Sequence, residues 1–125
     1  MNATALKTVL YVEDNPVNVH LVKSILALRG DVQFLSAARG DIGLALAHQH
    51  RPALILLDLH LLDMAGDEFL RRLQASDTGD IPVVILSGDS LDEAWDCLAG
   101  LAVAGYLAKP IDIDEFEKMI DQLLT

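Results

Sequence analysis

The sequence contains little cysteine, few aromatic residues and no long apolar run. Its 125 residues include one cysteine, Cys97, and aromatic residues make up 5% of the chain. A single cysteine excludes an internal disulfide and is typical of a reducing compartment. No apolar run approaches the roughly 20 residues of a membrane span, and the N-terminus lacks the apolar core of a signal peptide. We therefore expect a soluble, cytoplasmic domain with an aliphatic core.

Positive charge is also scarce. Nine lysine and arginine residues stand against 19 aspartate and glutamate residues, which gives a formal net charge of −10. Surfaces that bind nucleic acid need clustered lysine and arginine, and anionic membranes attract basic segments. The charge balance thus disfavours direct binding to nucleic acid or to a membrane. A chain of this length, with no linker or repeat, is expected to form a single domain over residues 1–125.

Short apolar runs alternate five times with segments of helical periodicity. The expected strands cover residues 6–12, 32–36, 53–58, 82–87 and 104–108, and the expected helices cover residues 16–30, 42–51, 69–73, 90–98 and 113–123. Alternation with short connections predicts parallel strands joined by right-handed crossovers. The fold class is therefore α/β, a three-layer sandwich.

Several local signals support the helices. Asn15 with Pro16, Ser90 with Glu93, and Asp112 with Glu115 are typical of helix starts. The expected apolar faces of three helices consist of Leu21, Val22, Ile25 and Leu28; of Ile42, Ala45 and Leu46; and of Ile113, Phe116, Ile120 and Leu123.

The central expected strand, residues 53–58, ends on a carboxylate. Five apolar residues in a row predict a strand buried on both faces, and Asp58 follows them. The carboxyl ends of parallel strands line the crevice where ligands bind. A lone aspartate there would most simply cap the next turn. The residues at the other strand ends favour a functional role instead.

Glu13 and Asp14 follow the first expected strand, Ser87 ends the fourth, and Lys109 follows the fifth. Three crowded carboxylates repel one another and need a cation, and oxygen ligands with room for water suit Mg²⁺. Asp58 would keep an oxygen free as a nucleophile, with a lysine and a hydroxyl to receive an anion. This combination serves phosphoryl transfer through an aspartyl phosphate.

In its motifs the chain resembles the receiver domains of response regulators over its whole length. The matching residues are the Glu13-Asp14 pair, Leu56-Leu57-Asp58 with Gly66 after it, Ser87-Gly88, and Tyr106-Leu107-Ala108-Lys109-Pro110. The resemblance implies a flavodoxin-like (βα)5 fold with strand order 2-1-3-4-5. The segment from Glu13 to Asn18 is especially similar to receivers attached to hybrid sensor histidine kinases, which exchange phosphate with histidine phosphotransfer proteins.

The resemblance also implies a role for each matching residue. Asp58 accepts a phosphoryl group from the phosphohistidine of a sensor histidine kinase or histidine phosphotransfer protein. Asp14, Asp58 and the His60 backbone carbonyl bind Mg²⁺, with Glu13 acting largely through water. The switch pair is Ser87 and Tyr106, and a cis peptide between Lys109 and Pro110 aims the lysine inward.

The implied protein is a signalling phosphoacceptor rather than an enzyme, with self-catalysed phosphorylation and slow autodephosphorylation. Output to a partner or domain passes through the surface of the fourth helix, fifth strand and fifth helix, and the protein is a monomer or weak homodimer. Three departures from the family pattern stand out: Leu62 for proline, Ala102 for glycine, which moves the end of the fourth helix toward Gly100, and Ser87 for threonine.

Other functions stay open at this point. A Mg²⁺-dependent phosphatase with Asp58 as nucleophile is the main alternative, although its usual second acid is replaced by His60 and no cap domain is present. A nucleotide-binding module would lack any glycine-rich phosphate motif. A degenerate receiver that serves only as an interaction module would not need the intact acids and Lys109.

Overall fold

The structure, a computed structural model, describes residues 6–88, 91–98 and 100–124. The elements are β1 (Lys7–Val12), α1 (Pro16–Ala27), β2 (Val32–Ala37), α2 (Gly40–His50), β3 (Leu54–Leu57), α3 (Gly66–Gln74), β4 (Val83–Ser87), α4 (Leu91–Cys97), β5 (Gly105–Ala108) and α5 (Ile113–Leu124). All strand pairs are parallel, and the order is β2-β1-β3-β4-β5. The predicted α/β, flavodoxin-like fold is confirmed.

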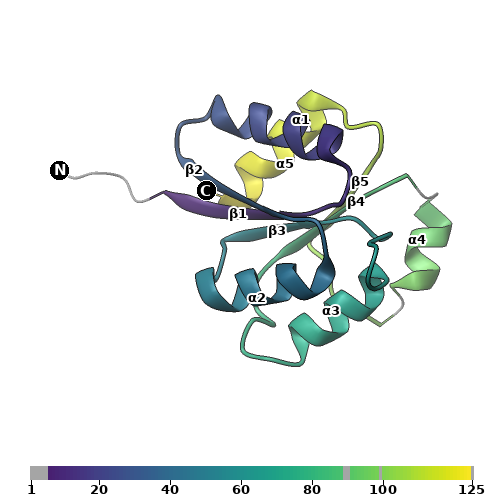
Figure 1. The fold of residues 1–125 in the computed structure, drawn as a ribbon. Helices are drawn as coiled ribbons and strands as arrows, with labels where there is room; N and C mark the ends of the chain where they lie inside the picture. Colours follow the sequence, from purple (N-terminus) through teal and green to yellow (C-terminus); the bar gives the residue numbers. More distant parts are fainter. Residues whose placement is uncertain (1–5, 89–90, 99, 125) are drawn as a thin grey trace.

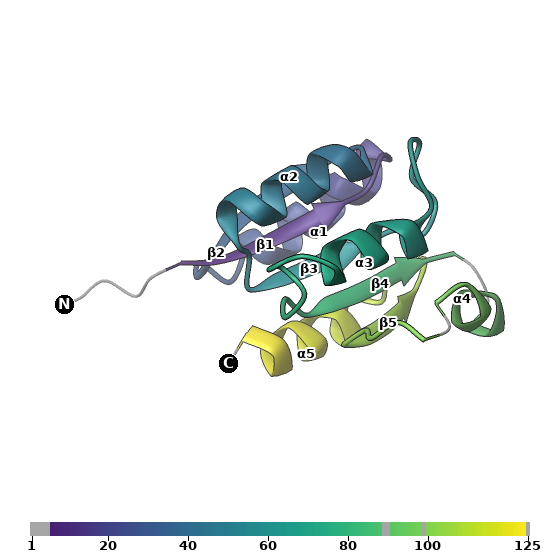
Figure 2. The same ribbon diagram turned by 90° about the horizontal axis from the view of Figure 1, so that it is seen from below.

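Helices cover both faces of the sheet (Figure 1). One face carries α1 and α5, and the other carries α2 and α3 together with α4, whose Ala94 joins the same core (Figure 2). Alternate residues of β1 enter the two cores: Leu10 packs toward α3, and Val9 packs toward α1 and α5. Every residue of β3 is fully buried, as the unbroken apolar run predicts.

Two of the predicted helix starts are confirmed. The Asn15 side chain accepts a hydrogen bond from the Val17 backbone N–H at 2.9 Å. The Asp112 side chain accepts one from the Glu115 backbone N–H at 3.0 Å. The third, at Ser90, lies outside the described residues.

Some predicted apolar faces are wrong at the helix ends. Leu28 is 88% exposed because α1 ends at Ala27, and Leu26 takes its place in the core. Ile113 is 48% exposed because it is the first residue of α5, where Leu124 extends the buried face of Phe116 and Ile120.

The fully buried residues of α2 are the small Gly40, Gly43 and Ala47. Of the predicted face, Ile42 and Ala45 are exposed, whereas Leu46 is partly buried against the core. This helix lies close to the sheet: a Cβ added at Gly43 would come within 2.8 Å of Val12 Cγ2. The contact face therefore needs glycine.

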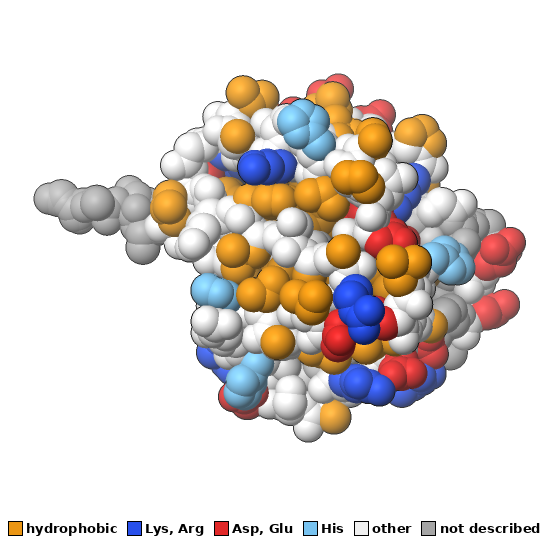
Figure 3. Space-filling model, viewed as in Figure 1, with side chains coloured by type: hydrophobic (Ala, Val, Ile, Leu, Met, Phe, Trp, Pro, Cys, Tyr) orange, Lys and Arg blue, Asp and Glu red, His pale blue; other side chains and the backbone are white. Residues whose placement is uncertain are grey.

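The surface agrees with the charge balance. On the face shown in Figure 3, the described basic side chains are scattered among acidic and apolar ones without a continuous basic patch. Those on α3 form ion pairs one helical turn apart, Arg71 with Asp67 and Arg72 with Glu68. None of the helices in the described ranges is long and apolar enough to cross a bilayer.

Candidate functional site

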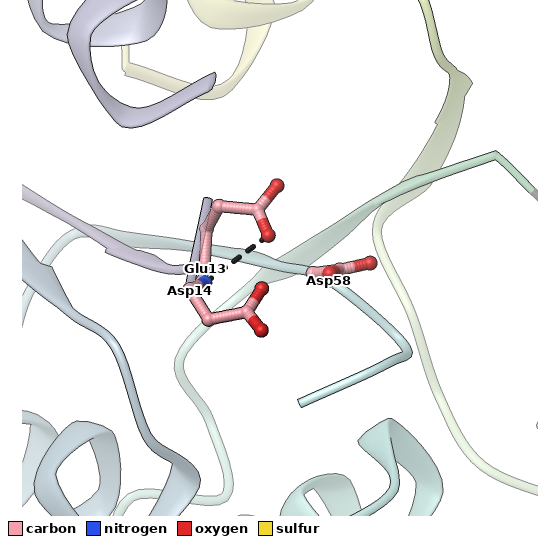
Figure 4. Close-up of side chains that lie close together, drawn as sticks. All are labelled: Glu13, Asp14 and Asp58. Atoms are coloured by element: carbon pink, nitrogen blue, oxygen red, sulfur yellow. Dashed lines mark hydrogen bonds between the residues drawn. The ribbon is translucent and has the colours of Figure 1, made fainter. Parts of the chain in front are cut away.

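Parallel pairing of β1 with β3 brings three carboxylates together. Val12 lies opposite Leu57 in the register, so the residues that follow each strand are neighbours. One oxygen each from Glu13, Asp14 and Asp58 lies within 4.8 Å of the others. We call these three residues the acidic cluster (Figure 4). Glu13 and Asp58 are buried, whereas Asp14 is partly exposed.

Glu13 is held by many donors. Its Oε1 accepts hydrogen bonds from the Tyr11 hydroxyl at 3.1 Å, from Asn18 Nδ2 at 3.0 Å and from Lys109 Nζ at 2.5 Å. Its Oε2 accepts from the Asp14 backbone N–H at 3.1 Å. Burial by itself raises the pKa of Glu13, but the hydrogen bonds, led by that from Lys109, outweigh it and lower this pKa to about 2. Glu13 is therefore ionised across the physiological range.

Sequence reasoning gave no role to Tyr11 and Asn18. Burial, together with the charge of Glu13, raises the pKa of the Tyr11 hydroxyl above its usual value, so Tyr11 remains a donor. The strand period contained a usable signal, because residues two apart point to the same face. A tyrosine two positions before a strand-end acid can reach that acid. Asn18 carried no comparable signal, because its contact depends on how α1 leaves the strand.

The electrostatic environment of Asp58 is the reverse of that of Glu13. Burial raises the pKa of Asp58 to about 6, and the adjacent Glu13 adds to the rise. Lys109 opposes it, with Nζ 3.6 Å from Asp58 Oδ1, as does a backbone hydrogen bond from His60. Near neutral pH the ammonium group of Lys109 therefore does not offset the whole negative charge of the acidic cluster, and a further cation would be favoured there.

The ends of β4 and β5 bring Ser87, Tyr106 and Lys109 to the same edge of the sheet. Ser87 is fully buried, and its backbone carbonyl accepts the Lys109 backbone N–H at 2.8 Å. The Tyr106 hydroxyl lies 3.5 Å from that same carbonyl. The peptide bond between Lys109 and Pro110 is cis. All predicted site residues that follow strands thus meet at one edge.

The loop between β3 and α3 is anchored at its base and its tip. His60 pairs with Ala65 in an isolated antiparallel bridge. At the base, a Cβ on Gly66 would lie 2.8 Å from Leu59 Cα, so only glycine fits. At the tip, Asp63 accepts two backbone N–H groups of α2, a contact that sequence reasoning missed. Leu62, where the family often has proline, is 76% exposed.

The donor set of the acidic cluster fits a hard divalent cation. Its ligand atoms are carboxylate oxygens, which Mg²⁺ prefers, and Asp14 is open enough to leave room for retained water. A divalent charge would favour the ionised form of Asp58 and so oppose both causes of its raised pKa, burial and the neighbouring Glu13.

Comparisons with known proteins agree with this geometry. A family model, the response regulator receiver domain, matches residues 9–121. The chain is 34% identical over 119 residues to the probable transcriptional regulatory protein TcrX of Mycobacterium tuberculosis, covering 94% of this chain but 49% of TcrX. It is 31% identical over 120 residues to the protein PilH of Pseudomonas aeruginosa, covering 94% of this chain and 97% of PilH. It thus spans about half of TcrX and nearly all of PilH.

The fold is also found among solved structures. One is the receiver domain of a sensor histidine kinase from Pseudomonas aeruginosa, with a magnesium ion coordinated in its active-site cleft. The two structures have a TM-score of 0.86 and 26% sequence identity, and the match covers 97% of this chain and all of that one.

The raised pKa of Asp58 predicts a pH-dependent gain in stability for Asp58→Asn in the absence of metal. An aspartate whose pKa rises from 3.8 when unfolded to about 6 when folded destabilises the fold above pH 6, and this penalty disappears as the pH falls toward 4. We expect Asp58→Asn to raise the free energy of unfolding by roughly 1–3 kcal/mol at pH 7.5 and by little at pH 4.

Urea denaturation in EDTA at the two pH values measures this difference. Asp92→Asn, on the exposed surface of α4, is the matched control for the loss of one carboxylate and should not reproduce the gain in stability at pH 7.5. An Asp58→Asn variant no more stable than the parent at pH 7.5 contradicts the prediction.

Proposed function

The chain belongs to the family of response regulator receiver domains, which act in two-component signalling systems, and we propose from this premise that it is a phosphoacceptor. Asp58 takes a phosphoryl group from a phosphohistidine. The observation that carries the proposal is the position of Asp58: a buried carboxylate at the end of β3, beside two further acids and 3.6 Å from an ammonium group.

In the proposed reaction, an Asp58 oxygen attacks phosphorus, the bond between phosphorus and the histidine nitrogen breaks, and the imidazole leaves. Negative charge spreads over the equatorial phosphoryl oxygens during transfer. Lys109 is positioned to stabilise that charge, because its ammonium already lies between Glu13 and Asp58. Ser87 supplies a hydroxyl from the neighbouring strand. The product is an aspartyl phosphate.

The proposed cofactor is Mg²⁺, held by Asp14, Asp58 and the His60 backbone carbonyl. When bound, the ion neutralises the carboxylates and orients the phosphoryl oxygens. Glu13 acts on it largely through water, because its Oε1 is already occupied by three donors. Asp14, partly exposed, is better placed for direct ligation.

Receiver domains interact with histidine kinases, with phosphotransfer proteins and with output domains. We propose a sensor histidine kinase or a histidine phosphotransfer protein as the donor. A receiver within a hybrid kinase is one form of this proposal, supported by the likeness to the receiver of a sensor histidine kinase. Residues 1–125 would then act as one cytoplasmic receiver domain.

The acceptor assignment predicts one modified residue. Incubation with acetyl phosphate and Mg²⁺ should add one phosphate mass, and Asp58→Asn should abolish the addition because the nucleophilic oxygen is lost. Intact-mass spectrometry measures both, with Asp77→Asn, a distant exposed acid, as the control that keeps full labelling. Full Mg²⁺-dependent labelling of Asp58→Asn would place the nucleophile elsewhere.

The metal assignment predicts unequal roles for the two neighbouring acids. Asp14→Ala should weaken Mg²⁺ binding by about tenfold or more and Glu13→Ala by less, because only the first removes a direct ligand. Isothermal titration calorimetry with Mg²⁺ compares the two dissociation constants. Equal losses would refute the assigned roles.

Phosphorylation is proposed to change the surface formed by α4, β5 and α5. An aspartyl phosphate carries about two negative charges and three acceptor oxygens, so it attracts the Ser87 hydroxyl and the Lys109 ammonium. Tyr106 contacts the backbone of Ser87, and movement there would let its ring turn inward. The added charge at Asp58 would thereby shift the balance between two conformations of the surface formed by α4, β5 and α5.

This switch predicts altered amide exchange in β4, α4 and β5 when beryllofluoride, a phosphoryl mimic, saturates the site. Lys109→Ala should still accept phosphate at a reduced rate, but the exchange difference should be lost because the ammonium that couples phosphate to β5 is missing. If amide exchange in the parent does not change when beryllofluoride saturates the site, the proposed switch is wrong, but the phosphoacceptor proposal still stands.

A further inference from the structure

Helix α2 is capped by a residue from a different loop. Asp63 accepts the backbone N–H of Gly40 at 2.7 Å and that of Asp41 at 2.9 Å, one on each carboxylate oxygen. Arg39, at the N-cap position, makes no side-chain capping hydrogen bond. First-turn N–H groups of a helix need acceptors, and here a residue more than 20 positions away supplies them.

A second contact joins the loop tip to the same helix. A Cβ at Gly40 would lie 2.6 Å from Met64 Cγ, so the Met64 side chain fills the space that glycine leaves. The tip of the loop is therefore held to α2 by two hydrogen bonds and by close packing.

The base of this loop reaches the acidic cluster. The loop begins directly after Asp58, and a backbone hydrogen bond from His60 holds the Asp58 carboxylate. Pairing of His60 with Ala65 and the bond from the Gly66 N–H to the Leu59 carbonyl, at 2.8 Å, close the loop into a short hairpin. The tip contacts with α2 and the base contacts beside Asp58 therefore belong to one closed hairpin.

We propose that Asp63 is a positioning residue for the acidic cluster: by fixing the loop against α2 it sets the His60 backbone that faces Asp58. Mg²⁺ binding at the cluster is thereby coupled to the capping of α2. This inference rests on the proposed function of the cluster as a Mg²⁺ site. Because coupling between two sites is reciprocal, Mg²⁺ binding should stabilise the capping hydrogen bonds of α2, and the capping hydrogen bonds should strengthen Mg²⁺ binding.

Asp41 provides a matched control. It lies in the same first turn, carries the same charge, and its carboxylate accepts the Ile42 N–H at 2.8 Å and pairs with Arg39. Its carboxylate lies beside that of Asp63, but its own hydrogen bond and ion pair are to residues of its own segment, so its loss leaves the bonds between Asp63 and the α2 backbone in place. Asp41→Ala and Asp63→Ala should both lower stability toward urea, whereas only Asp63→Ala should alter the metal site.

Calorimetric titration with Mg²⁺ tests the proposal in the parent and three variants. We expect Asp63→Ala to raise the dissociation constant about fivefold or more, and Asp41→Ala to leave it within about twofold of the parent. Asp63→Asn, which keeps one acceptor oxygen and serves if the alanine variant fails to fold, should have an intermediate value. Equal constants for the Asp63 and Asp41 variants would overturn the proposal.

Amide exchange at the first turn of α2 tests the same coupling at the helix cap. Mg²⁺ should slow exchange of the Gly40 and Asp41 amides in the parent and have no effect on them in Asp63→Ala. If the parent binds Mg²⁺ but the exchange rates of these two amides do not change, the coupling is overturned and the proposed metal site is not. A parent that fails to bind Mg²⁺ overturns the proposed metal site and this inference with it.

Discussion

Repulsion among the three carboxylates of the acidic cluster is the constraint on which the site depends. Parallel pairing of β1 with β3 forces Glu13, Asp14 and Asp58 together, and the fold compensates unevenly. Lys109, Tyr11 and Asn18 all donate to one oxygen of Glu13. Asp58 receives less compensation and keeps a raised pKa. The imbalance favours a cation beside Asp58, so binding of a metal ion would offset an electrostatic cost of folding.

The two cores keep this arrangement rigid. Strand β3 is buried on both faces, so Asp58 follows a strand whose residues are all packed in the two cores. Lys109 comes from the far edge, where its backbone N–H is tied to the Ser87 carbonyl. Backbone pairing brings the charged groups to one edge of the sheet, and the ion pair between Lys109 and Glu13 completes the arrangement. In the proposed switch, the side chains that rearrange are those of Ser87, Tyr106 and Lys109.

The α/β class and the strand-end residues of the site could be predicted from local patterns in the sequence, whereas the strand order came from the resemblance to receiver domains. Alternating apolar runs fixed the order of elements, and the residue after each run identified Asp58 and Lys109. Predictions failed where tertiary contacts decide. Leu28 and Ile113 fit helical periodicity but lie at helix ends. The cap from Asp63 depends on how a loop meets α2, which no local pattern encodes.

The close approach of α2 to the sheet has a consequence for how this chain can diverge. Position 43 has no room for a side chain while Val12 and Phe69 keep their present volumes. Overpacking a core contact of this kind typically costs about 1–3 kcal/mol, a large fraction of the roughly 5–15 kcal/mol by which folded domains are stable. Among relatives, a larger residue at position 43 should therefore accompany a smaller one at position 12 or 69, and these sites should vary as a group.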